Sequence, residues 1–295
     1  MPSFAASFVG FMLRTTGHYR RMFTGGPQFQ KNISKVRSGP QPSPSVKAGL
    51  DVRQSTFQGR PVWHIAPKDR TPSAHVLFWH GGGYVYPATD IHWKFLSRMA
   101  SQYGWSVTAP LYPLAPENAA AHITSWANDY YAAYRDEIGH KPFVMGGDSA
   151  GGGLTAALAQ MARDAAQPLP AALLLICPWL NLDPAHPDQL KTEPRDGILT
   201  ISGISEGGTL YAGNLPRTDP RCSPIFGNWD GLPSILAFAG GDDILVTDSR
   251  ALKAKLPSVE VTELSGMMHD WPIFSFSESR KAQAQMADFV ARAVA

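Results

Sequence analysis

Short runs of hydrophobic residues alternate along the chain with longer stretches in which hydrophobic residues recur every three or four positions. The short runs, most of which end at Gly, Pro or His, are 74–79, 105–109, 143–145, 171–177, 235–239 and 259–264. The stretches with helical periodicity are 91–103, 126–138, 149–166, 249–256 and 278–294. Runs of this length predict buried strands, and their alternation with helices predicts a mostly parallel central sheet with helices on both faces.

Residues 183–230 interrupt this alternation with prolines, glycines and residues of mixed polarity. We interpret them as an insertion rather than as part of the sheet core. No internal repeat divides the chain. The pattern therefore predicts one sheet domain over residues 46–295 with an insertion at about 183–220.

The first 45 residues have a different pattern. Phe4, Phe8, Phe11 and Met12 share one face of a predicted helix, and such a stripe usually docks onto a core. Prolines 40, 42 and 44 then predict an extended linker.

Composition changes this picture little. The chain has 295 residues, of which 44% are hydrophobic and 17% are charged, so it can bury a sizeable core. The chain contains no run of about eighteen apolar residues, so we predict no transmembrane segment. Cys177 and Cys222 could form one disulfide, but a reducing compartment fits them at least as well, and we predict a cytoplasmic protein.

Charge is distributed unevenly. Seven basic side chains precede the first acidic residue, Asp51, and the remainder of the chain is net acidic. Three interpretations of this basic arm stay open: a lid segment over an acidic body, a contact with an anionic membrane, and an organellar transit peptide. No nucleic-acid recognition motif accompanies the arm, so we predict no nucleic-acid partner.

Two segments match G-x-S-x-G, the motif around a nucleophilic serine. Ser149, in 147–151, follows an apolar run and opens a helical pattern, which is the strand–turn–helix context that the motif requires. Ser205, in 203–207, lies in the insertion and is followed by Glu-Gly-Gly, a poor start for a helix. The glycines on both sides of Ser149 permit the sharp turn that joins such a strand to such a helix. We therefore predict Ser149 as the nucleophile.

Three glycines follow His80 directly after the predicted strand 74–79. Such a run lets backbone N–H groups converge on the negative oxygen that forms when an ester carbonyl is attacked. No Lys-Ser/Thr follows, which argues against a phosphate-binding loop. We predict an oxyanion hole built from the N–H groups of Gly81, Gly82 and Ala150, with His80 orienting the loop rather than binding a metal.

A serine needs a base to remove its proton and an acid to orient that base. Only His186 and His269 follow Ser149, and only His269 lies in a loop after the last predicted strand. The acid is expected after the strand 235–239, where Asp242 and Asp243 are adjacent. The Asp-x-Leu pattern favours Asp243.

The chain resembles the hormone-sensitive-lipase family of esterases, in its bacterial-type GDSAG group. The matching segments are HGGGY at 80–84, YPLAPE at 112–117, GDSAGG at 147–152, CPWLNL at 177–182, DPRCSPI at 219–225, GGDDIL at 240–245 and GMMH at 266–269. The resemblance implies the α/β-hydrolase fold, no metal or organic cofactor, and a helical lid built from the N-terminal segment and the insertion. It also implies homodimers in many members, some formed through the edge strand near 259–264.

The activity implied by the resemblance is hydrolysis of short- to medium-chain carboxylic esters through a Ser149 acyl-enzyme, the substrate being a small-molecule ester. A lactone hydrolase or an acyltransferase would use the same triad, and a non-catalytic ligand receptor is a more remote alternative. Asp270 departs from the family, and we expect it to raise the pKa of His269 if it points inward. Candidate pocket walls are Tyr84, Trp179, Met267 and Trp271.

Overall fold

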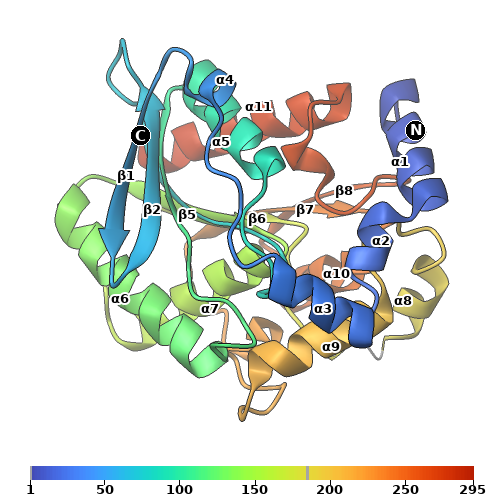
Figure 1. The fold of residues 1–295 in the computed structure, drawn as a ribbon. Coiled ribbons are helices and arrows are strands. Elements are labelled where there is room, and N and C mark those ends of the chain that lie inside the picture. Colours follow the sequence, from blue (N-terminus) through green and yellow to red (C-terminus); the bar gives the residue numbers. More distant parts are fainter. Residues whose placement is uncertain (1, 184–185) are drawn as a thin grey trace.

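The computed structural model describes residues 2–183 and 186–295 (Figure 1). Residues 1 and 184–185, of which the latter fall in the expected insertion, lie outside the described residues. The described chain forms an eight-stranded sheet of order β1-β2-β4-β3-β5-β6-β7-β8. The strands are β1 (Leu50–Phe57), β2 (Arg60–Pro67), β3 (Ala74–Trp79), β4 (Trp105–Pro110), β5 (Phe143–Asp148), β6 (Ala172–Ile176), β7 (Ser234–Gly240) and β8 (Glu260–Leu264).

Most of this sheet is parallel. β1 and β2 form an antiparallel hairpin, and β2 pairs antiparallel with β4. Every other neighbouring pair is parallel. The predicted parallel sheet is therefore confirmed, with an additional hairpin that the sequence did not reveal.

Helices cover both faces of the sheet (Figure 1). One face packs against α5 (Asp90–Tyr103) and α11 (Ser277–Val294), and the other against α6 (Ala120–Ile138), α7 (Ala150–Asp164) and α10 (Val246–Lys255). Because successive side chains of a strand point to opposite faces, Val76 joins the first of these cores and Leu77 the second. Short 3-10 helices lie at Pro224–Phe226 and Trp271–Ile273.

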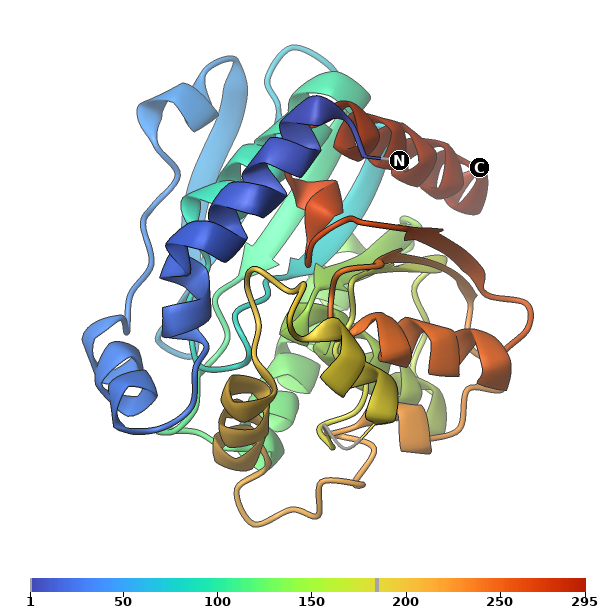
Figure 2. The same cartoon turned by 90° about the vertical axis from the view of Figure 1, so that its right-hand side faces the viewer.

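The remaining helices belong to the N-terminal segment and the insertion, which lie side by side (Figure 2). The Arg20 guanidinium donates to the carbonyl oxygens of Glu193 (2.7 Å) and Asp196 (2.6 Å), and the Thr200 hydroxyl donates to the Phe23 carbonyl at 2.6 Å. These helices are α1 (Phe4–Thr16), α2 (His18–Met22), α3 (Pro27–Lys35), α4 (Pro44–Lys47), α8 (Pro187–Thr192) and α9 (Ile201–Ala212).

The insertion contains the helices α8 and α9, although its sequence pattern is irregular. Both of its helices begin at side-chain caps: His186 accepts a hydrogen bond from the Asp188 N–H, and Thr200 accepts one from the Gly203 N–H. Ser205 lies inside α9, where the sequence predicted a poor helix start.

The orientation of α1 also contradicts the sequence analysis. The helix packs on the protein through Ala6 and Gly10, whereas Phe4 is 87% exposed and Phe8 and Phe11 are each 54% exposed. The apolar stripe that was expected to dock onto the core faces outward. Among the described residues, no helix combines the length and the apolar character that crossing a bilayer requires.

Candidate active site

Ser149 lies on a sharp turn between β5 and α7. Its backbone has a φ of 52° and a ψ of −120°, a conformation that side-chain-bearing residues rarely adopt. Its N–H donates to the Ile176 carbonyl at 2.8 Å. A Cβ at Gly147 would collide with the backbone of Gly151, and a Cβ at Gly151 would collide with the Trp79 carbonyl. The strand–turn–helix context predicted for Ser149 is thus confirmed, and both glycines are sterically required.

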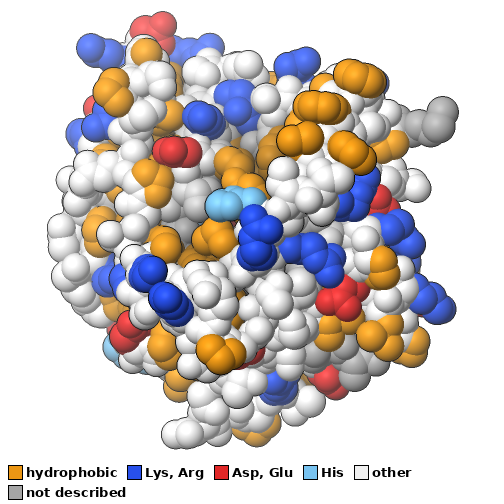
Figure 3. Space-filling view, turned by 45° about the vertical axis from the view of Figure 1, so that its right-hand side comes forward, with side chains coloured by type: hydrophobic (Ala, Val, Ile, Leu, Met, Phe, Trp, Pro, Cys, Tyr) orange, Lys and Arg blue, Asp and Glu red, His pale blue; other side chains and the backbone are white. Residues whose placement is uncertain are grey.

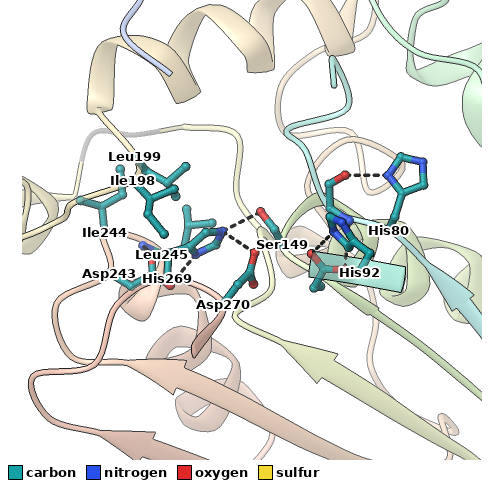
Figure 4. A network of polar contacts seen from close by, with 12 residues as sticks. His80, His92, Ser149, Ile198, Leu199, Asp243, Ile244, Leu245, His269 and Asp270 are labelled. Atoms are coloured by element: carbon teal, nitrogen blue, oxygen red, sulfur yellow. Dashed lines mark hydrogen bonds and ion pairs between the residues drawn. The ribbon is translucent and has the colours of Figure 1, made fainter. Parts of the chain in front are cut away.

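Ser149, His269 and Asp243 meet at the carboxyl ends of the strands although they are far apart in sequence (Figure 4). Ser149 Oγ lies 3.0 Å from His269 Nε2, and His269 Nδ1 lies 2.8 Å from Asp243 Oδ2. All three side chains are buried. The geometry is that of a nucleophile, its general base and an acid that orients the base.

The two adjacent aspartates have different surroundings. Asp243 is fully buried, and its second oxygen accepts the Leu245 N–H at 2.8 Å. The Asp242 side chain instead pairs with Arg195 at 3.0 Å and Arg14 at 3.8 Å, away from the imidazole. The structure therefore brings Asp243, and not Asp242, to His269.

His80 holds the glycine loop from within. Its Nδ1–H donates to the Gly81 carbonyl at 2.7 Å, and its ring stacks on Tyr112 with centroids 4.4 Å apart. Burial lowers the pKa of His80 to about 4, so the ring is neutral at pH 7. These contacts agree with the predicted role of His80 in orienting the loop.

The structure contradicts the prediction for Gly81. Its N–H donates to Asp148 Oδ1 at 3.0 Å, so it is not available to an oxyanion. Asp148 Oδ2 lies 3.1 Å from His92 Nε2, so the carboxylate ties the loop to α5. In the part of the chain that the structure describes, the N–H groups of Gly82, Gly83 and Ala150 donate to no protein acceptor. The sequence analysis did not single out Asp148, because the G-x-S-x-G motif allows any residue at that position.

Asp270 points inward and contacts the same imidazole nitrogen as the serine. Its Oδ2 lies 3.1 Å from His269 Nε2. Burial raises the pKa of Asp270 to about 7, against the opposing effect of His269. Burial alone would lower the pKa of His269, but the carboxylates of Asp243 and Asp270 raise it well above its ordinary value.

Asp270→Asn is expected to move the acidic limb of the pH profile of kcat/KM to lower pH. His269 can accept the serine proton only while Nε2 is unprotonated, and the neutral amide no longer stabilises a proton there. Nε2 therefore loses its proton at a lower pH in the variant than in the wild type. The measurement is kcat/KM for p-nitrophenyl acetate between about pH 5 and 9.

The control is Asp188→Asn, which removes an exposed carboxylate that pairs with Lys191 outside the site. Its profile should match that of the wild type. If the Asp270→Asn profile also matches, the carboxylate does not influence the base.

A mainly apolar cavity opens beside Ser149 and His269. The N-terminal helices contribute Leu13, Tyr19, Met22 and Phe23, the insertion contributes Ile198 and Leu199, and the segment after His269 contributes Ile273 and Phe274. A smaller cavity that also borders Ser149 is lined by Gly83, Trp179 and Leu245 among others. The N-terminal segment and the insertion thus supply most of the apolar walls.

The predicted pocket walls are mostly core residues. Tyr84, Met267 and Trp271 are buried and line neither cavity, and only Trp179 borders the smaller one. Tyr84 stacks on Tyr211 with ring centroids 3.5 Å apart. These predicted aromatic residues therefore pack behind the site, whereas the N-terminal segment and the insertion supply much of its wall.

Asp196 is a second residue that the sequence analysis missed. Its Oδ1 accepts the N–H groups of Ile198 and Leu199, and its Oδ2 accepts that of Ile244 at 3.0 Å. Asp196 is fully buried. Its burial, and to a smaller extent the negative charge of the nearby Asp243, raises the pKa of Asp196 to about 6. Asp196 thereby fixes the insertion to the loop that carries Asp243. An Arg-Asp-Gly sequence gives no sign of this, since it is typical of a surface turn.

Among the described residues, one group of three side chains of the kinds that bind metals lies close together: Cys177, Asp243 and His269. His269 Nδ1 already binds Asp243, and burial raises the pKa of the Cys177 thiol well above its ordinary value. A neutral thiol and a hydrogen-bonded pair do not suit a metal. Both cysteines are free, so the disulfide alternative was wrong.

Residues 76–273 match the family described as having the alpha/beta hydrolase fold, and this span includes Ser149, Asp243 and His269. The chain belongs to the α/β-hydrolase family. It is 32% identical over 254 residues to LipR of Mycobacterium tuberculosis, provisionally named an acetyl-hydrolase, with 83% of this chain and 80% of LipR covered. It is 34% identical over 206 residues to an acetyl-hydrolase of Streptomyces hygroscopicus, covering 66% and 67%.

The same fold recurs in solved structures of this family. A hormone-sensitive lipase from a metagenome library superimposes with a TM-score of 0.85 at 24% identity, over 98% of each chain. At that identity the likeness supports the fold alone. The resemblance to the hormone-sensitive-lipase family therefore rests on the sequence motifs and on this shared fold.

Proposed function

We propose that this α/β-hydrolase, a carboxylesterase by family, cleaves short- to medium-chain esters through an acyl-enzyme on Ser149. The observation that carries the proposal is the hydrogen-bonded series from Ser149 through His269 to buried Asp243, at the edge of an apolar cavity. The apolar walls suit an acyl chain. The Streptomyces relative named an acetyl-hydrolase supports a short one.

In the proposed reaction, Ser149 Oγ attacks the ester carbonyl carbon while its proton passes to His269 Nε2. The N–H groups of Gly82, Gly83 and Ala150 stabilise the resulting oxyanion, since Gly82 and Gly83 border the two cavities beside Ser149. The intermediate collapses as the C–O bond breaks, and the leaving alkoxide takes the proton from Nε2. Water then repeats both steps on the acyl-enzyme and releases the acid.

Two further expectations stay proposals. A cytoplasmic location is supported by two buried free cysteines, which suit a reducing compartment. Homodimer formation is supported by the position of β8 at the edge of the sheet, where its outer backbone groups are unpaired within the sheet.

The substrate class can be tested with p-nitrophenyl esters from acetate to palmitate. We expect kcat/KM to be highest at short chains and to fall toward palmitate, because the apolar cavity is bounded by the N-terminal helices and the insertion. A maximum at palmitate would contradict the proposed chain length. Turnover of ε-caprolactone by a folded protein that cleaves none of the esters would instead establish a lactone hydrolase.

A further inference from the structure

The exposed face of α1 is unusually hydrophobic for a protein surface. Of the seven large hydrophobic side chains that are most exposed among the described residues, four lie on α1 and a fifth lies on α2. They are Phe4, Phe8, Phe11, Met12 and Tyr19, and the Phe4 and Phe8 rings stack with centroids 6.3 Å apart. Figure 3 shows hydrophobic side chains gathered in a row on this side of the molecule. A contiguous exposed patch of this kind marks an interaction site.

The charge around this face is positive. Of the seven basic residues before Asp51, only Arg14 and Arg37 pair with an acidic side chain, Asp242 and Glu117 respectively, in the described structure. Arg20 and Arg21 donate to carbonyl oxygens and keep their full charge. The bordering acids are themselves engaged, since Asp242 also pairs with Arg195 and Glu278 binds the Ser3 hydroxyl. Five of the seven basic residues therefore pair with no acidic side chain among the described residues.

We propose that α1 docks onto an anionic phospholipid surface, with its phenylalanines in the boundary between headgroups and acyl chains. A helix with one apolar face and a basic surrounding is the usual form of an interfacial anchor. A second copy of this chain is a poorer occupant, because an α1–α1 contact would bring two basic arms together. The bilayer supplies both an apolar layer and the opposite charge.

The position of α1 gives this docking a consequence for the enzyme, which rests on the proposed function. Leu13 of α1 and Tyr19 and Met22 of α2 line the cavity at Ser149. The helices that would touch the lipid therefore also form the wall of the substrate cavity. Esters dissolved in the membrane are the substrate class that such docking would deliver.

The test is sedimentation of the full chain with vesicles of phosphatidylcholine alone and of equimolar phosphatidylcholine and phosphatidylserine. We expect binding to the mixed vesicles that weakens with added salt. The triple variant Phe4→Gln, Phe8→Gln, Phe11→Gln should bind at least about tenfold more weakly, since it loses the apolar insertion. The matched control is Leu190→Gln with Phe226→Gln, which removes hydrophobic side chains that are 65% and 49% exposed elsewhere, and its binding should equal that of the wild type.

Three results would overturn the proposal: no binding of the wild type to the mixed vesicles, equal binding of the triple variant, or loss of a dimer in that variant without a change in vesicle binding. The last would assign the face to a second copy. Ser149→Ala separates docking from catalysis, because it should sediment with the vesicles whatever the outcome of the ester assays. Unchanged hydrolysis of soluble p-nitrophenyl butyrate would show that the triple variant is folded.

Discussion

Ser149→Ala is expected to lower kcat for p-nitrophenyl butyrate by about a million-fold, whereas Ser205→Ala should leave it unchanged. Without Oγ the enzyme has no nucleophile, and His269 has no proton to remove. The remaining rate would come from the oxyanion hole and substrate binding alone. Steady-state hydrolysis of purified variants, checked for folding by circular dichroism, provides the measurement.

Ser205 is a closely matched control because it occupies the other G-x-S-x-G segment. It lies inside α9, and its hydroxyl makes no hydrogen bond recorded among the described residues, although its carbonyl accepts from Arg217 at 2.8 Å. A large loss in Ser205→Ala, or appreciable activity in Ser149→Ala, would show that the wrong serine has been assigned.

The candidate triad could be predicted from the sequence because local constraints mark each of its members. The turn at Ser149 excludes side chains at Gly147 and Gly151, so the glycines are visible as a motif. Asp243 and His269 each follow a strand that the sequence pattern predicts, and parallel strands carry such loops to the same edge of the sheet. Chain order and strand order therefore contain most of the information on the triad.

The hairpin of β1 and β2 could not be found in this way. Half of the side chains of β1 are exposed, and its polar and charged residues leave no continuous hydrophobic run. Pro61 and Pro67 in β2 also argue against a strand in sequence. The turn at Gln58-Gly59 is only a weak sequence signal for a hairpin. The hairpin joins the sheet through the pairing of β2 with β4, which the local sequence does not indicate.

Helix α1 shows why periodicity alone does not assign a buried face. The spacing of its phenylalanines correctly predicts a helix with one apolar side. The opposite side carries the small residues Ala6 and Gly10, which are buried against the protein, with Met268 next to Gly10. Which face docks depends on that fit, and it can be determined only from the assembled structure.

The oxyanion loop illustrates a similar limit. Three successive glycines indicate N–H groups without side-chain obstruction, but they do not show where each N–H points. Asp148 sets the direction of the Gly81 N–H by accepting its hydrogen bond. Asp148 is in turn held by His92 of helix α5. The directions of backbone groups follow from such tertiary contacts and are not encoded within the motif.

Asp243→Asn is expected to lower kcat by about ten-thousand-fold, and Asp242→Asn by little. Asp243 accepts the Nδ1–H of His269 and so leaves Nε2 free to take the serine proton. An amide can donate to Nδ1 instead, which favours the tautomer with the proton on Nε2 and removes the base. The geometry would be preserved while the chemistry fails.

Asp242→Asn tests the neighbouring carboxylate under the same change of charge. It weakens ion pairs to Arg195 and Arg14 that are partly exposed, and such pairs contribute less than about 1 kcal/mol to stability. Both variants should fold, so a comparison of kcat at saturating p-nitrophenyl butyrate separates the two aspartates. A larger loss in Asp242→Asn would reverse the assignment. It would also require the loop after β7 to rearrange during catalysis, because Asp242 points away from the imidazole in this structure.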